Sequence, residues 1–106
     1  MTVIMVIAYP KDANVNMAYY LEHHLPAILP SWTASGMRGW RVLTATAAGP
    51  ESPYGVVTEI EWPDMQTFHR AQEATPPEVT KKSAEDLKNY AQKAPAIWFM
   101  EVGAGA

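Results

Sequence analysis

The run from Thr2 to Tyr9 places the strongest constraint on the fold of this chain. It consists mainly of Val, Ile and Met and carries no charge. Hydrophobicity that is continuous, rather than alternating from residue to residue, indicates a strand covered on both faces. The fold must therefore place this strand in a sheet and supply a cover for each side of it.

Helical and extended segments follow in a recognisable order. Asn16 can cap a helix that runs from Met17 to about Ser35, with Gly36 as its stop signal. Pro63-Asp64 starts a short helix. Thr75-Pro76 resembles the start of another, with Thr75 as its cap and Pro76 in its first turn. The predicted strands are Thr2–Tyr9, Gly39–Ala47, Gly55–Trp62 and Ala96–Val102. This order predicts an α+β, ferredoxin-like βαββαβ fold, a four-stranded antiparallel sheet with helices on one face.

Strands that are apolar on both faces need more than one layer of helices. In the predicted fold the helices cover one face of the sheet only, and the other face needs a cover as well. The sheet of an identical chain is the simplest one, so we expect a homodimer. The charged fraction of 18% is slightly low, which agrees with a surface covered by a partner.

Length and charge narrow the class of protein. We expect the 106 residues to form one domain, residues 1–106. The net charge is −3 and no basic run is present, so nucleic acid is not an expected partner. The first apolar run is too short to cross a membrane or to act as a signal peptide, so we expect no membrane partner and a cytoplasmic location.

The first predicted helix contains a proline beside two histidines. Pro26 cannot donate a hydrogen bond to the carbonyl of Glu22, so we expect a kink or break near His24 and Leu25. Pro30 predicts a second disturbance. On a helical wheel the residues that cluster within roughly 60° are Met17, Leu21, His24 and Ile28, with Tyr20 beside them.

His24 therefore lies on the apolar face, one turn from Tyr20, whereas His23 points about 100° away, towards Tyr19. An imidazole titrates near neutrality, so His24 can donate or accept a proton at the edge of a cavity. The alternative is a core histidine with one hydrogen-bond partner.

Aromatic residues suggest the walls of such a cavity. Trp32 lies on the inner side of the first helix, while Trp62 and Trp98 lie on strands, and most residues of this kind are core. Aromatic walls beside one imidazole suit a flat, apolar ligand that carries a phenol or enol. His69 can line the same space or remain a half-exposed helix residue. The candidate substrate-binding residues are Ile28, Trp32, Trp62, His69, Tyr90 and Trp98.

Neither a metal nor a cofactor is expected. Adjacent histidines on a helix diverge, so His23 and His24 cannot easily hold one ion. His69 and Asp86 add candidate ligands but no tight ligand spacing. The chain has no cysteine, which excludes thiolate metal sites and disulfides.

Several motifs, in order along the whole chain, resemble the EthD-like family (named for ethyl tert-butyl ether degradation) of the dimeric α/β-barrel superfamily. They are Tyr20-x-x-x-His24-x-Pro26, Gly36-x-x-Gly39, Tyr54 before an apolar strand, Trp62-x-x-x-x-x-Phe68, and Asp86-x-x-Asn89-Tyr90 with Pro95. The resemblance implies two chains whose sheets close into a barrel, with a cavity between sheet and helices in each chain. It also implies that the position of His24 is a shared active residue; the doubled histidine departs from the motif.

Three functions remain open at this point. In the first, a cofactor-free enzyme of lyase or isomerase type uses His24 to move a proton during decarboxylation, elimination or isomerisation of an apolar phenolic or polyketide-like molecule. Tyr20 would orient the imidazole or bind a substrate oxygen, and Asp86 would add a second polar group. The second is a cofactor-independent monooxygenase of phenols, and the third is a non-catalytic carrier of a small molecule. Fold alone does not decide among them.

Overall fold

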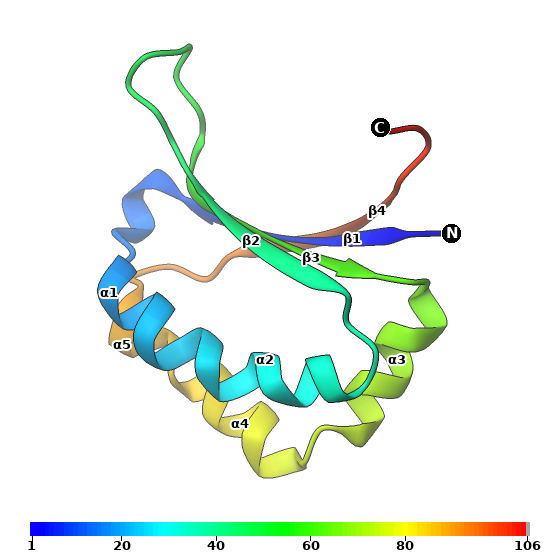
Figure 1. Ribbon diagram of the computed structural model, residues 1–106. Helices are drawn as coiled ribbons and strands as arrows, with labels where there is room; N and C mark the ends of the chain where they lie inside the picture. The colour runs from blue at the N-terminus through cyan, green and yellow to red at the C-terminus, as the bar shows by residue number, and fades with distance from the viewer. Residues whose placement is uncertain (106) are drawn as a thin grey trace.

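The computed structural model describes residues 1–105, which form a four-stranded antiparallel sheet with the α-helices on one side and a short helical turn (Lys11–Ala13) at the end of the first strand (Figure 1). The strands are β1 (Val3–Pro10), β2 (Gly39–Thr44), β3 (Tyr54–Trp62) and β4 (Ala96–Glu101), in the order β2-β3-β1-β4. The predicted ferredoxin-like βαββαβ fold is confirmed.

Strand β1, predicted as a strand covered on both faces, lies in the interior of the sheet. It pairs with β3 on one side, with Val3 opposite Trp62, and with β4 on the other, with Val3 opposite Glu101. Buried residues occur on both of its faces, and Ala8 has no exposed surface. The strand therefore fixes the relative positions of β3 and β4.

The first helical region begins and ends where the sequence predicted. It comprises α1 (Met17–Tyr19), a π-helical turn η2 (Tyr20–His24) and α2 (Leu25–Ala34). The side chain of Asn16 caps it by accepting a hydrogen bond from the Tyr19 amide at 3.1 Å. Gly36, with φ of 108°, follows its end, in a backbone conformation that favours glycine. Pro30 lies inside α2 and does not interrupt it, so the second predicted disturbance is not a break.

The second helical region consists of α3 (Met65–Ala74), α4 (Pro77–Glu85) and α5 (Leu87–Tyr90). Asp64 caps α3 by accepting the Thr67 amide at 2.7 Å. The prediction that Thr75 caps the next helix was wrong: Thr75 ends α3, and its hydroxyl donates to the Ala71 carbonyl at 2.7 Å. Proline at position 76 disfavours a helical conformation at Thr75, which is extended with ψ of 125°.

The core lies between the sheet and the helices. Trp62, Tyr20 and Ile60 are the largest apolar side chains in it that are fully buried. Trp62 packs edge-on against Trp32, with ring centroids 5.7 Å apart, and against Phe68 at 5.3 Å. Among residues 1–105, no helix has both the length and the apolar character needed to cross a membrane.

Candidate active site

A cavity of about 430 Å³ lies between the sheet and the two helical regions. Its inner end is formed by buried side chains, Tyr9, Tyr20, His24 and Tyr90. Exposed lining residues mark its mouth, between α3–α4 and the edge strand β4; they are Gln72, Thr80, Ala84 and Ile97. The cavity therefore has a polar, aromatic inner end and an opening towards solvent.

The π-helical turn η2 presents His24 to this cavity. The Leu25 amide donates to the carbonyl of Tyr20, five residues back, instead of to that of Leu21. Pro26 follows directly and has no N–H for the Glu22 carbonyl, so the regular pattern is lost where the sequence predicted a disturbance. His24 is 8% exposed, while its neighbour His23 is exposed and lies against the ring of Tyr19. The two histidines diverge as the helical wheel indicated.

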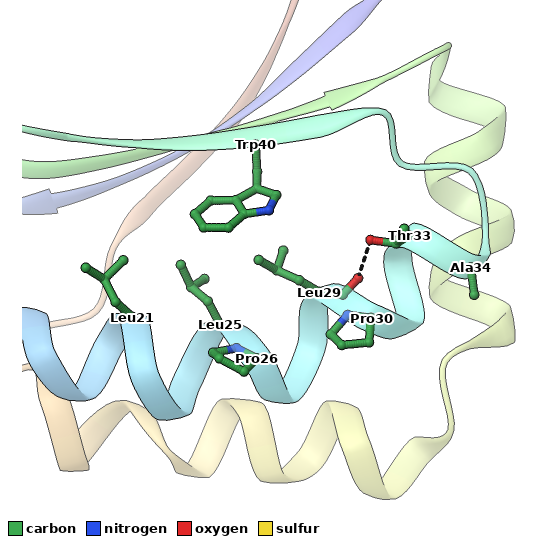
Figure 2. Close-up of a pocket in the computed structure, with 8 residues that line it drawn as sticks. All are labelled: Leu21, Leu25, Pro26, Leu29, Pro30, Thr33, Ala34 and Trp40. Carbon is green, nitrogen blue, oxygen red and sulfur yellow. Dashed lines mark hydrogen bonds between the residues drawn. The ribbon is translucent and has the colours of Figure 1, made fainter.

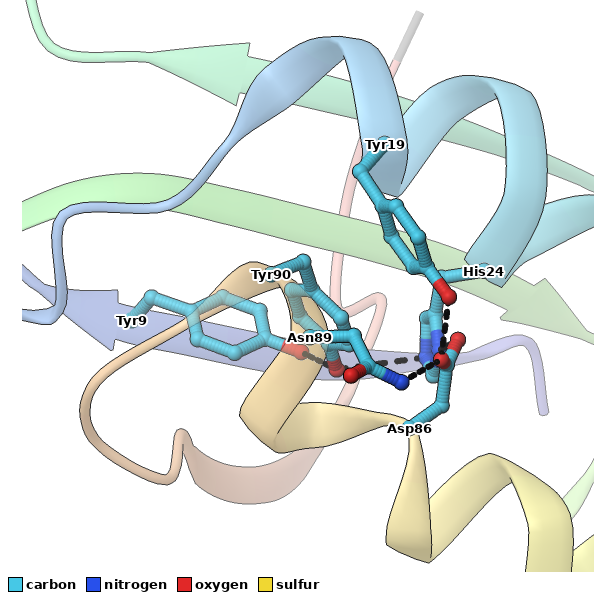
Figure 3. Close-up of polar contacts among 6 residues, drawn as sticks. All are labelled: Tyr9, Tyr19, His24, Asp86, Asn89 and Tyr90. Atoms are coloured by element: carbon cyan, nitrogen blue, oxygen red, sulfur yellow. Dashed lines mark hydrogen bonds and ion pairs between the residues drawn. The ribbon is translucent and has the colours of Figure 1, made fainter.

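Both ring nitrogens of His24 have partners (Figure 3). Nδ1 lies 3.1 Å from Oδ2 of Asp86, at the start of α5, and Nε2 lies 3.2 Å from the hydroxyl of Tyr90, at its end. The Tyr90 hydroxyl lies 2.8 Å from that of Tyr9, on β1. Residues from three separate elements thus form one chain of hydrogen bonds that leads from the cavity to the Asp86 carboxylate.

The partners fix the direction of each hydrogen bond. A carboxylate only accepts, so Nδ1–H of His24 donates to Asp86, and the neutral ring then offers Nε2 as an acceptor for the Tyr90 hydroxyl. Tyr90 in turn accepts from Tyr9. Oδ1 of Asp86 accepts from Tyr19 at 2.6 Å and from Asn89 at 2.9 Å, which holds the carboxylate in place.

Burial and hydrogen bonding together determine the charges in this cluster. It lowers the pKa of His24, although hydrogen bonding and attraction to Asp86 oppose the effect. Burial alone would raise the pKa of Asp86, but the hydrogen bonds from Asn89, Tyr19 and His24 outweigh it and lower that pKa. Burial also raises the pKa of Tyr90 to about 12. At neutral pH the cluster therefore holds a neutral imidazole between a carboxylate and a phenol.

This arrangement predicts that acid destabilises the protein through His24. The imidazole has a pKa of 6.5 when unfolded and a lower pKa when folded, so the unfolded state binds more protons between these values. The titration of His24 should leave the free energy of unfolding unchanged above pH 6.5 and should lower it as the pH falls below 6.5. Urea unfolding of the wild type and of His24→Gln from pH 8 to 4.5 measures the difference; the same slope in both proteins near pH 6 would contradict the assignment.

The structure brings some of the residues selected from the sequence together and separates others. Ile28, Trp32 and Tyr90 line the cavity with Tyr20 and His24, and Asp86 lies behind His24. Tyr20 stacks on His24 with ring centroids 5.5 Å apart, but its hydroxyl pairs with Thr58 at 2.6 Å. It therefore supports the imidazole by packing and not by a hydrogen bond.

Three of the residues selected as substrate-binding lie outside the cavity lining. Trp62 is enclosed in the core, and Trp98 lies on the other face of the sheet beside Tyr54, with ring centroids 6.0 Å apart. His69 is exposed on α3, next to Phe68. Successive side chains of a strand point to opposite faces of the sheet. Because Phe99 packs inward against Phe68, its neighbour Trp98 points outward.

Two tyrosines of the cluster were not selected from the sequence. Tyr9 shares an inward-facing strand row with Met5 and Ile7. Because the run Thr2–Tyr9 is continuously hydrophobic, its sequence does not indicate which of its two faces turns towards the helices. Tyr19 belongs to the cluster because its hydroxyl bonds to Asp86, which is 67 residues away. The local sequence contains no signal for that contact.

A second hollow, of about 530 Å³, lies between α2 and the edge strand β2 (Figure 2). Leu21, Leu25 and Leu29 project from the helix towards Trp40 on the strand. Its only hydroxyl, that of Thr33, donates to the Leu29 carbonyl at 3.0 Å. Because none of its lining residues titrates, this groove offers no acid–base chemistry, and the cavity beside His24 is the candidate active site. No cluster of three or more His, Cys, Asp or Glu side chains suited to a metal ion occurs within residues 1–105.

Known structures with this architecture match the whole chain. An EthD-like protein from Ralstonia eutropha JMP134 matches with a TM-score of 0.77 at 20% identity, over 99% of this chain and 95% of its own. An EthD family protein from Bacillus halodurans C-125 matches with a TM-score of 0.67 at 22% identity, over 96% and 99%. SnoaB, a cofactor-independent oxygenase from Streptomyces nogalater, matches with a TM-score of 0.61 at 14% identity, over 98% and 93%. Neither a family model nor a curated protein matches the chain. The chain therefore has the fold of EthD-like proteins over essentially its full length, in agreement with the resemblance in its sequence motifs.

Proposed function

We propose that this protein is a small enzyme that moves a proton on a flat, apolar phenolic or polyketide-like molecule without a cofactor. The observation that supports this best is the hydrogen-bond chain of the cavity, Tyr90 to His24 to Asp86, with distances of 3.2 Å and 3.1 Å. A neutral imidazole that is held by a carboxylate and bonded to a phenol inside a cavity is suited to general acid–base catalysis.

In this proposal Tyr90 contacts the substrate and His24 acts through it. As the substrate gives up a proton from carbon or oxygen to the Tyr90 oxygen, the Tyr90 proton passes to Nε2 of His24. Asp86 stabilises the imidazolium that forms, as a carboxylate does in other His–Asp pairs. Return of the proton by the same route to a different substrate atom completes an isomerisation, and loss of a leaving group completes an elimination.

Tyr90→Phe tests the relay. It removes the hydroxyl that joins His24 to the cavity and keeps the ring, so we expect turnover to fall by about 100-fold or more. Tyr54→Phe, on the far face of the sheet, is the matched control. Turnover of flat phenols and enolisable ketones and unfolding by urea should both be measured, because a tyrosine with only a structural role would lower stability and leave turnover unchanged.

A second candidate is a monooxygenase reaction of an electron-rich phenol with oxygen, in which the same His24 takes the phenol proton. The fold similarity to SnoaB, which is a cofactor-independent oxygenase, supports this second candidate. Oxygen consumption during turnover distinguishes the two, since activity under anaerobic conditions excludes an oxygenase. If ligands bind and none is ever converted, the remaining alternative is a carrier protein.

We also propose that the open face of the sheet pairs with a second copy of the chain. Large apolar side chains remain exposed there: Leu43 at 40%, Trp98 at 37% and Met100 at 59%. They alternate with inward residues such as Phe99 and so face away from the helices. Light scattering at low micromolar concentration should give the mass of a dimer, and a monomer would contradict the proposal.

A further inference from the structure

The cavity lining carries no cation. Of the described residues that line it, none is Lys or Arg. Its polar side-chain groups are hydroxyls, the indole N–H of Trp32, the amide of Gln72 and the imidazole of His24, which burial keeps neutral at pH 7 by lowering its pKa. Every group that faces a bound molecule is therefore uncharged under these conditions.

The fixed charge that lies directly behind the base of this cavity is negative. Asp86 accepts the Nδ1 proton of His24 at 3.1 Å and remains ionised, since its pKa is lowered. Lys82 and Lys88 do not line this cavity; with Glu85 and Asp86 they line another hollow, of about 370 Å³. Both lysines are exposed there, so neither compensates an anion inside the cavity.

A carboxylate that enters this space loses its hydration without gaining a counterion, and Asp86 repels it. An uncharged oxygen suffers neither effect. Gln72, Thr80 and Ser83 place hydrogen-bonding groups along the α3–α4 side of the lining, and the tyrosine–histidine cluster provides them at the base. Oxygen functions at the two ends of a flat molecule can thus both find partners.

We propose that the cavity selects uncharged flat phenols with a second neutral oxygen function and excludes the corresponding carboxylates. This rests on the proposed function, since it concerns the same cavity and the same His24–Tyr90 base. It also narrows the reaction: isomerisation or elimination of a neutral substrate fits this lining, whereas decarboxylation of a free acid does not.

Two probes that share one ring system and differ in charge test this inference. Methyl 6-hydroxy-2-naphthoate is neutral, and 6-hydroxy-2-naphthoate carries a carboxylate at pH 7.5 on the same ring system. Isothermal titration of the full-length protein should show the ester binding at least about tenfold more tightly than the acid. If the acid binds as tightly as the ester, charge selection is refuted while the cavity remains a binding site. If neither probe binds at millimolar concentration, the cavity as a binding site is refuted, and the proposed function with it.

A pair of glutamine variants tests the electrostatic cause. Gln72→Lys places an ammonium at the mouth of the cavity, whereas Gln66→Lys makes the same change at an exposed position of α3 outside the lining. The ratio of ester to acid affinity should fall about tenfold in Gln72→Lys and should stay at the wild-type value in Gln66→Lys. An equal ratio in the two variants would overturn the electrostatic explanation.

Discussion

Replacing His24 by alanine should reduce turnover by about 100- to 10,000-fold on any compound that the wild type converts. Nε2 of His24 accepts the hydrogen bond of the Tyr90 hydroxyl, and the alanine variant removes this acceptor. The KM should change less than kcat, because the imidazole acts on the transferred proton through Tyr90. Steady-state kinetics at pH 7.5 measures both quantities.

The neighbouring histidine provides a matched control. His23→Ala makes the same chemical change one residue earlier, on an exposed side chain that contacts the ring of Tyr19. We expect its turnover to stay within about twofold of the wild type, since the hydrogen bonds that would carry the proton join Tyr90, His24 and Asp86 and do not involve His23. Equal losses in the two variants, or a loss below twofold in His24→Ala, would exclude His24 as the acid–base residue. Circular dichroism confirms that each variant is folded.

The largest effect on stability is expected at Trp62. Its side chain has no exposed surface and packs against Trp32 and Phe68 at the centre of the core. Trp62→Ala should lower the free energy of unfolding by about 3–5 kcal/mol, because it removes an indole and leaves a cavity. For a domain of this size, that loss is a large fraction of the total free energy of unfolding. Urea unfolding, followed by circular dichroism, measures the change.

The conservative variant separates packing from hydrogen bonding. The indole Nε1 of Trp62 is buried and has no hydrogen-bond partner among the described residues. Trp62→Phe loses this N–H without breaking a hydrogen bond, so its cost should be much smaller than that of alanine. If phenylalanine cost as much as alanine, an undetected partner of Nε1 would have to hold the indole. A core role also predicts that Trp62→Phe binds flat phenols as the wild type does.

The fold was predictable because each element had a local signal. Continuous hydrophobicity identified the first strand, and Asn16 and Gly36 marked the ends of the first helical region. The misplaced boundary at Thr75 arose because threonine before proline suits both the start of one helix and the end of another. Local propensity cannot choose between these two, whereas packing of α3 onto the sheet can.

The site was predictable only in part. His24 and Tyr20 followed from helical periodicity, because both lie on one helical face. The contacts of His24 with Asp86 and Tyr90 join residues 62 and 66 positions apart, and they exist only once α5 docks against η2. Trp62 and Trp98 were selected by residue type, and only the three-dimensional arrangement shows that one fills the core and the other the opposite face.

One side chain borders both the cavity beside His24 and the groove under Trp40. Leu25 lines each of them, and no other residue is common to the two linings. A shorter side chain at this position is expected to open the two hollows towards each other. Leu25→Ala should therefore let the cavity accept longer molecules than the wild type does.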